Sequence, residues 1–553
     1  MDTIDFFSIN LYTYNIIQLA EVSEMDRKKP IQYALYLVII FGLFFPDNSF
    51  GKSDDRLATE ALTDYFDLIR SGNYESARGM WEPSAREKST RFGIEYDGIQ
   101  VKSDCNSPVI YDLEHVKDKL NVGIKSKSTL DTGLIRIQFG LETSKGTTTN
   151  LYYAKKLGDY FWFIFPQDYY AADWPVYESR YFRFFVNPQR DNSYNKIASA
   201  TLDSFVEKTA AKLSISSDRL DVLAEKKIDY YLCIDPLEVR KLSGQQTDGF
   251  YDKASDAIIS SVFPEFHLVA QLLVNFKLQK LPLFTLPVME KGLAISFGGK
   301  WQRAPGVILD FGEYILDYKL TEIDSVLTAV GNENNDVPDI TFPVEACLID
   351  YIYNFLKADK FFQLYRSLSG DKRFISSLTT EDVKSIIADS FNQSWSEFKR
   401  QFENYISSDN SHGGRIFPGQ TKTNQVLLNE NGLVVSSSDK WLEISYSDLN
   451  DQNHEVTLMF FRPASLNGKS SKLFDEQIKN SREYNGYRYG IRIDANEIGL
   501  YDYAINQLRA KYVYNFAPDP AYFDSTEGKI SAYFDIKLLD GNLPGSSDYE
   551  IIR

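Results

Sequence analysis

Residues that commonly build catalytic and structural centres are scarce in this chain of 553 residues. It has three cysteines and no C-x-x-C pair of the kind that holds zinc. So few cysteines exclude a disulfide framework, and we expect Cys233 and Cys347, which lie in apolar surroundings, to be buried thiols. The four histidines are also far apart in the sequence, so a site of several histidines would need distant segments; they are His115, His267, His412 and His454.

The chain also lacks any block of basic residues, and its formal net charge is −17. Nucleic-acid binding depends on clustered Lys and Arg that contact phosphates, so we expect no nucleic-acid partner. Several motifs of common enzymes are absent as well: G-x-S-x-G, the P-loop and G-x-G-x-x-G do not occur. These absences leave few enzyme classes open.

Long hydrophobic runs are missing except for one near the N-terminus. Residues 31–45 are apolar, follow a basic segment at 27–29 and precede the small-x-small sequence at 49–51. This pattern over 25–51 predicts a secretory signal peptide, because the run is short for a membrane span. We therefore predict a secreted or periplasmic protein with no membrane span beyond this segment; an uncleaved anchor is the alternative. Residues 1–24 are interpreted as an overcalled start.

Residues 54–174 are predicted to form an α+β domain. Apolar residues recur at helical spacing over 57–69, a second short helix follows at 74–81, and three strand-like runs then occur at 133–142, 149–156 and 160–165. The segment YFDLIRSGNYESARGMW followed by these strands resembles the cone-shaped fold of the nuclear-transport-factor-2-like superfamily. Such domains serve as enzymes, binding pockets or packing modules, and the residues here favour an accessory packing domain.

The most informative stretch begins at Glu265. Its apolar residues recur at threes and fours and predict one helix; they are Phe266, Val269, Leu272, Leu273, Phe276 and Leu278. Pro282 ends the helical pattern, because proline lacks an N–H and restricts the residue before it. A second apolar helix then carries the sequence E-K-G-L-A at 290–294.

This layout resembles the active-site core of the gluzincin metallopeptidases, the thermolysin-like and aminopeptidase-like zincins of the peptidase MA-like superfamily. In that family the first helix carries H-E-x-x-H, whose two histidines lie on one helical face and grip a zinc ion. The glutamate between them is the general base for the zinc-bound water. A glutamate on the second helix, often in the context E-G-L-A, is the third ligand.

In this chain the corresponding motif is H-L-V-A-Q. His267 matches the first ligand, whereas Leu268 replaces the general base and Gln271 replaces the second histidine. Glu290 matches the third ligand by its distance from His267, but alignment on G-L-A places Lys291 there instead. A leucine cannot take a proton and an amide is a poor zinc ligand, so the standard mechanism cannot operate on these residues.

The resemblance extends over 180–407. A strand, a helix, a second strand and a short helix precede a strand-like G-x-Y-D segment. Two helices are then predicted within 342–370, and the closing helices at 380–406 start at an N-cap around Thr380. Family members pair extended substrate with the strand before the motif helix. The resemblance therefore makes Gly249, Tyr251 and Asp252 candidates for the edge of a binding cleft.

Residues 408–414 read as a linker, and 415–553 as a β-sandwich with turn signals between short strands and one helix near 497–509. Exposed aromatic residues could stack on sugar there, with Trp441, Tyr487 and Tyr489 as the candidates. The alternative is that these side chains pack across strands.

The sequence therefore predicts a multidomain α+β protein: an N-terminal α+β cone-like domain, a central, mainly helical zincin-like domain with a small sheet, and a C-terminal β-sandwich. The replaced motif favours an exported, catalytically inactive gluzincin-like module that binds or scaffolds, with no cofactor expected. One alternative is a zinc-dependent metallopeptidase with non-standard ligands, using His267 and Glu290. Another is a polysaccharide-binding protein that works through its C-terminal domain. The predicted partner is a peptide, protein or glycan ligand of the cell envelope.

Overall fold

The computed structural model describes residues 49–406 with short gaps, together with the strands and some connections of the C-terminal part. The gaps are 117–119, 121–122, 131–132, 144–145, 159, 283, 329–338, 371–374 and 376, and the later described segments are 425–430, 433–437, 441–446, 456–460, 487–493, 497–513, 523–524, 529–540 and 549–552. The predicted signal segment and the 408–414 linker therefore lie almost wholly outside the described residues. Within them, no helix has both the length and the apolar composition of a membrane span.

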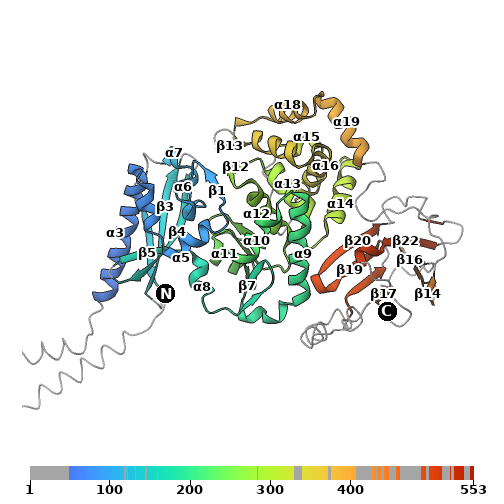
Figure 1. Cartoon of the computed structure of the whole chain (residues 1–553), viewed down its shortest axis with the longest axis horizontal. Helices are drawn as coiled ribbons and strands as arrows, with labels where there is room; N and C mark the ends of the chain where they lie inside the picture. Colours follow the sequence, from blue (N-terminus) through green and yellow to red (C-terminus); the bar gives the residue numbers. More distant parts are fainter. Residues whose placement is uncertain are drawn as a thin grey trace, which may run out of the picture. The chain divides into compact units, whose positions relative to one another are not determined.

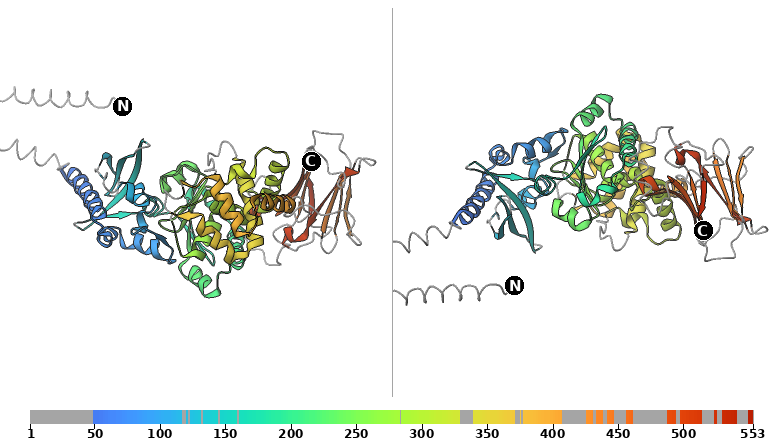
Figure 2. Two further views of the ribbon diagram at one scale, coloured as in Figure 1. Left: turned by 90° about the horizontal axis from the view of Figure 1, so that it is seen from above. Right: turned by 90° about the horizontal axis from the view of Figure 1, so that it is seen from below.

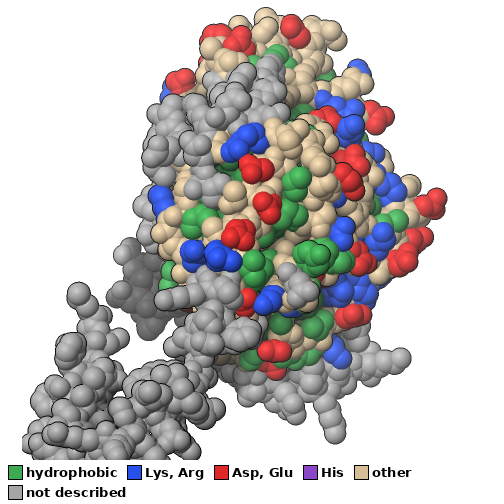
Figure 3. Space-filling model, turned by 90° about the vertical axis from the view of Figure 1, so that its left-hand side faces the viewer, with side chains coloured by type: hydrophobic (Ala, Val, Ile, Leu, Met, Phe, Trp, Pro, Cys, Tyr) green, Lys and Arg blue, Asp and Glu red, His purple; other side chains and the backbone are tan. Residues whose placement is uncertain are grey.

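The chain divides into two compact units, 1–61 and 62–553, and the first contributes only the start of helix α3 (Ser49–Ser71) to the described structure. The fold is mixed α+β with several separate sheets, as the sequence predicts (Figure 1). On the face shown in Figure 3, basic and acidic side chains are interspersed and do not gather by sign.

An antiparallel sheet of four strands follows the first helices. Helices α4 (Tyr74–Gly79) and α5 (Pro83–Thr90) precede it, and the strands pair in the order β2-β3-β4-β5; they are β2 (Ile124–Thr129), β3 (Leu134–Thr143), β4 (Gly146–Leu157) and β5 (Tyr160–Ile164). Aromatic rings fill the space between α3 and this sheet, with Phe66 and Phe139 centroids 4.7 Å apart. The predicted helices and strands of this region are thus confirmed.

Strand β1 (Glu95–Asp97) leaves this part of the chain and pairs in parallel with β11 (Lys280–Pro282), which lies between the two predicted motif helices. A buried ion pair reinforces this junction: Arg91 Nη1 lies 2.6 Å from Asp229 Oδ2, and both side chains are almost inaccessible to solvent. Asp229 also pairs with Arg183. Residues 91–97 are therefore held to the central sheet and helices by both charge and backbone pairing.

The central part contains a five-stranded sheet in the order β6-β7-β8-β10-β9. Strands β7 (Phe182–Val186), β8 (Ile228–Leu232) and β10 (Ala257–Ser260) are parallel, whereas β6 (Val176–Glu178) and β9 (Gly249–Asp252) are antiparallel edge strands. Helices α9 (Lys196–Lys212), α10 (Ser217–Lys226) and α11 (Pro236–Ser243) connect the strands.

Helices dominate the rest of the central part (Figure 1). They share one large hydrophobic core with α9 and the sheet. They are α12 (Phe266–Leu278), α13 (Pro287–Gly298), α14 (Pro305–Asp317), α16 (Thr341–Ser367), α18 (Thr380–Ser390) and α19 (Trp395–Ile406). Helix α16 breaks at Lys357, whose φ is 62°, so the prediction of two helices in this segment is confirmed. The N-cap of α18 is Thr379, one residue before the predicted position, in a capping box with Asp382.

The C-terminal part forms two five-stranded sheets, visible as separate orange-to-red layers in Figure 2. One has the order β14-β15-β16-β22-β21 and the other β20-β19-β18-β17-β23. The strands of the first sheet are β14 (Gln425–Glu430), β15 (Leu433–Ser437), β16 (Trp441–Tyr446), β22 (Lys529–Asp535) and β21 (Phe523–Asp524). Those of the second are β20 (Gln507–Val513), β19 (Glu497–Asp502), β18 (Tyr489–Ile493), β17 (Val456–Phe460) and β23 (Tyr549–Ile552). Side chains from both sheets meet in one buried cluster, as Ile444 from β16 (Trp441–Tyr446) and Ile491 from β18 (Tyr489–Ile493) illustrate.

The predicted helix near 497–509 is wrong. This segment forms β19 (Glu497–Asp502), a single 3₁₀ turn and β20 (Gln507–Val513), which pair antiparallel. Asn506 joins them in a left-handed conformation, with φ of 46°. The apolar residues of this segment resemble a helical pattern because the short turn between the strands interrupts the strict alternation of inward-facing and outward-facing side chains.

Candidate functional site

Helix α12 exposes only one small part of its surface. Ten of its residues are buried, and the three that are not are His267, Gln271 and Lys277. His267 and Gln271 are one turn apart and therefore lie on the same side of the helix. We call this side, defined by His267 and Gln271, the motif face, because it carries the two positions that hold zinc in gluzincins.

His267 is held by a neighbouring carboxylate. Its Nδ1 atom lies 2.5 Å from Oε1 of Glu265, and both side chains are about nine-tenths buried. Residues two apart within a helix point to different sides. Glu265 can reach His267 because it is the N-cap residue, has an extended backbone and lies outside the helix.

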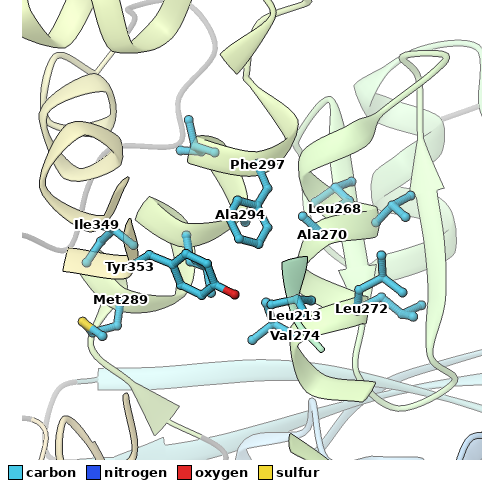
Figure 4. Close-up of a cluster of buried hydrophobic side chains, with 14 of the residues drawn as sticks. Leu213, Leu268, Ala270, Leu272, Val274, Met289, Ala294, Phe297, Ile349 and Tyr353 are labelled. Carbon is cyan, nitrogen blue, oxygen red and sulfur yellow. The ribbon is translucent and has the colours of Figure 1, made fainter. Parts of the chain in front are cut away.

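Leu268, at the position of the general base, is part of the hydrophobic core. Only 4% of it is exposed, and Figure 4 shows it among buried apolar side chains. Its Cδ1 packs against strand β9 where Gly249 has no side chain: a Cβ at Gly249 would lie 2.7 Å from it. The contact that Leu268 makes with β9 is therefore aliphatic.

Helices α12 and α13 are neighbours, as the resemblance implies, and their close approach occurs at Gly298. A Cβ on Gly298 would collide with the backbone of His267, so the end of α13 lies against the start of α12. Glu290 is eight residues before Gly298, which is about 12 Å along the helix axis at 1.5 Å per residue. Its Oε1 lies 3.1 Å from Nζ of Lys253. His267 is thus paired with the carboxylate of Glu265, whereas Glu290 is paired with the ammonium group of Lys253.

Lys291, the alternative third-ligand position, belongs to a second group of side chains. Its Nζ lies 5.4 Å from the ring centroid of Phe342, and Nζ of Lys300 lies 4.8 Å from the same centroid. Glu345, one turn after Phe342 on α16, is fully buried beside these lysines. We call Lys291, Lys300, Phe342 and Glu345 the Phe342 cluster.

Glu345 is the unusual member of this cluster. Neither of its carboxylate oxygens has a hydrogen-bond partner among the described residues. Burial raises the pKa of Glu345 to about 7, and the ammonium group of Lys291 opposes that rise. Burial and the Glu265 carboxylate raise the pKa of Asp248, and the ammonium group of Lys300 lowers it. Lys300 therefore interacts electrostatically with both Glu345 and Asp248.

These residues do not fit a hydrolytic zinc site. Such a site needs three protein ligands and a base, but the motif face supplies one imidazole and one neutral amide. The third position holds either a lysine or a glutamate that is already paired with Lys253. Across the described part of the chain, no group of three or more His, Cys, Asp or Glu side chains is placed to hold a metal ion.

The predicted edge strand is present as β9, at the end of the central sheet and next to α12. The Asp248 carbonyl accepts a hydrogen bond from the Ser261 N–H, so by antiparallel alternation the backbone groups of Gly249 and Tyr251 point away from β10. Asp252 is used differently: it accepts hydrogen bonds from Asn106 and Gln167. Gly249 and Phe250 are half-exposed, whereas Tyr251 and Asp252 are buried.

The aromatic candidates in the C-terminal part do not form an exposed platform. Tyr487 is 2% exposed and Tyr489 is fully buried, so the prediction that they are exposed is wrong. The Tyr489 ring belongs to the core between the two sheets, and its hydroxyl donates a hydrogen bond to Asp540. The side chain of Trp441 lies outside the described part of the structure.

Several residues of the site were missed from the sequence. Glu265 and Lys253 are the partners of the two candidate ligands, and Lys300 and Glu345 belong to the Phe342 cluster. Only Glu345 carried a recognisable signal, because it is a charged residue inside the apolar run FPVEACLI. Lys253 and Lys300 contact residues that are distant in sequence, and Glu265 lies just outside the helix that holds its partner His267.

Comparison of the chain with protein-family profiles and with curated proteins finds no match.

Proposed function

We propose that this chain is an exported, catalytically inactive relative of the gluzincins, and that it binds an extended peptide segment of a cell-envelope protein along β9 and the motif face. One observation carries the proposal: the only partly open positions on the N-terminal half of α12 are those that hold zinc in gluzincins, while the catalytic position between them is sealed against Gly249. In this proposal the motif face keeps the position of the family's zinc site but lacks the residues that catalyse hydrolysis.

The backbone of β9 supports a peptide ligand over a compact small molecule. An edge strand offers N–H and C=O groups in a row, and an added strand satisfies them in pairs. Phe250 and Gly249 are half-exposed, so this stretch of the edge can be reached, whereas Asp252 is occupied by its bonds to Asn106 and Gln167. The proposed contact is therefore short, and side-chain contacts with the motif face must add to it.

A photocrosslinking experiment tests this proposal. A photoreactive amino acid replaces Gln271 in one variant and Lys277, the third half-buried residue of α12, in a matched control. Both are exposed to a library of extended peptides. We expect crosslinked peptide at position 271 and not at 277, and loss of the crosslink when alternate peptide amides are N-methylated. Equal labelling at both positions, or no effect of methylation in either register, would refute strand addition here.

Zinc titration calorimetry separates this proposal from the metallopeptidase alternative. We expect either no binding or weak binding that His267→Ala leaves unchanged. Tight one-to-one binding that this substitution abolishes would overturn the proposal and favour a metallopeptidase with non-standard ligands. A glycan array probed with the same protein tests the remaining alternative: binding that a Trp441→Ala substitution removes would assign the activity to the C-terminal sheets.

A further inference from the structure

A tight turn directly after α13 has a backbone that its own sequence disfavours. Trp301 and Gln302 both have positive φ, 51° and 58°. Lys300 and Arg303 flank them and exchange two backbone hydrogen bonds, of 3.2 and 2.9 Å. Positive φ at both central residues is the mark of a type I′ turn, which strongly prefers Asn-Gly or similar pairs. A bulky aromatic residue followed by glutamine is a poor choice for these positions.

Residues from the C-terminal sheets hold this turn from outside. The Leu508 N–H donates to the Gln302 carbonyl, and the Ala304 N–H donates to the Leu508 carbonyl. The Asn506 side-chain amide also donates to Oε1 of Gln302, at 2.5 Å. Leu508 is buried with Ala304 and Val307, so an apolar contact accompanies the polar ones.

The same turn carries side chains that reach the Phe342 cluster. The Trp301 ring lies 6.1 Å from the Phe342 ring, centroid to centroid, and Lys300 Nζ lies over the same ring. Lys291, at the third-ligand position of the family motif, contacts this ring as well. The conformation of the turn therefore decides where Lys300 and Trp301 lie relative to a former ligand position.

We infer that the C-terminal sheets act as a positioning module for the central part of the chain: Asn506 and Leu508 impose the left-handed turn at 301–302 and so place Lys300 and Trp301 against Phe342. Without these contacts the turn relaxes, because Trp and Gln favour negative φ. Loss of the turn moves one cation away from Asp248 and Glu345. The inference that this movement affects a ligand rests on the proposed function, whereas the inference that Asn506 and Leu508 impose the turn does not.

Hydrogen exchange of the full chain tests the inference through the amides of Lys300, Arg303 and Ala304. We expect Asn506→Ala to speed their exchange at least tenfold. Asn354→Ala, which removes an exposed amide from α16 far along the chain, is the matched control and should leave them unchanged. Gln302→Ala removes the acceptor of the hydrogen bond that Asn506 donates and serves as a second variant. Unchanged protection of these amides in both variants would overturn the inference.

A second set of variants separates an effect of Asn506 on the turn from a general loss of stability. The double substitution W301N/Q302G gives the turn a sequence that adopts type I′ geometry by itself. In this background we expect Asn506→Ala to have little effect on the exchange of the turn. An equally large effect in both backgrounds would show that Asn506 acts on overall stability and would refute the inference. Peptide crosslinking at position 271 is a separate readout: its absence, with exchange behaving as expected, would reject the proposed function alone.

Discussion

Leu268 and Gly249 are packed so closely that any side chain at Gly249 would require Leu268 to move. The Leu268 Cδ1 atom occupies the space in which a Gly249 side chain would begin, 2.7 Å from the Cβ position. This contact joins α12 to the edge strand β9 and buries Leu268 in the core. It therefore contributes to the stability of the central part and, under the proposed function, occupies the position of the family's general base.

The first prediction concerns this contact. Gly249→Ala should destabilise the protein by about 1–3 kcal/mol, because an added methyl group in a packed core forces neighbouring atoms to move. Urea unfolding measures the change. Gly79→Ala is the control, since nothing lies within 4 Å of a Cβ there and its φ is not positive, and it should be neutral or stabilising. The double variant with Leu268→Ala should recover part of the loss; strictly additive losses would show that the two residues do not touch.

A second prediction addresses restoration of the catalytic motif. Leu268→Glu should cost about 2–4 kcal/mol at neutral pH, because it buries a carboxylate without a partner. The folded state raises the pKa of such a group, so the cost should shrink as the pH falls from 7 to about 4, below which the glutamate is protonated in both states. Leu268→Met, which conserves volume, is the control and should cost less than about 1.5 kcal/mol.

The measurement is urea unfolding at pH 4 and pH 7, combined with a peptide-hydrolysis assay of the double variant L268E/Q271H. We expect no hydrolysis with added zinc, because the third-ligand position remains Lys291 or the paired Glu290. A stable, zinc-dependent hydrolase produced by these two substitutions would contradict our account of the site.

A third prediction follows from a buried carboxyl in the four-stranded part. Asp104 Oδ2 accepts hydrogen bonds from the hydroxyls of Tyr65 and Tyr152, at 3.0 and 2.8 Å. Burial raises the pKa of Asp104 to about 7, against the hydrogen bonds that lower it. The folded pKa exceeds the unfolded value of 3.8, so the protonated form stabilises the fold below pH 4 and this contribution is lost as the pH rises to about 7.

We therefore expect the wild type to lose up to about 4 kcal/mol between pH 4 and pH 7 from this group, taking 1.36 kcal/mol for each unit of pKa. Asp104→Asn cannot ionise and should flatten that part of the profile. Chemical denaturation across the pH range measures it, with the exposed Asp67→Asn as control. A profile of Asp104→Asn that keeps the wild-type slope would contradict the assignment.

The fourth prediction tests the junction at β1. Asp229→Asn should destabilise the protein by about 3–5 kcal/mol, because it leaves the buried guanidinium of Arg91 without its charge partner. Glu397→Gln removes the partner of the exposed Arg400 and should change stability little. Urea unfolding followed by circular dichroism compares the two. Similar small effects would show that the carbonyls of Ser255 and Asp256, which also accept from Arg91, suffice to hold it.

The sequence predicted the helices of the central part well because their apolar residues repeat at threes and fours and bury one face. It could not predict β1 and β11, since each has three residues and its partner is far away in the chain. The contact between Glu265 and His267 could not be predicted, because Glu265 is the N-cap of a helix that begins at Phe266 and so does not follow helical spacing. Tyr489 was misjudged because an aromatic residue on a strand looks the same from sequence whether it faces solvent or the opposite sheet.

The pairing of β1 with β11 also sets an order of events during biosynthesis. Strand β1 is made early, but it has no neighbour until the ribosome reaches Lys280, so its edge stays open while the intervening segments emerge. Nascent chains or truncations that stop before Lys280 contain the partners of Arg91 but carry an unsatisfied strand edge at β1. We expect such fragments to depend on chaperones until β11 has been made.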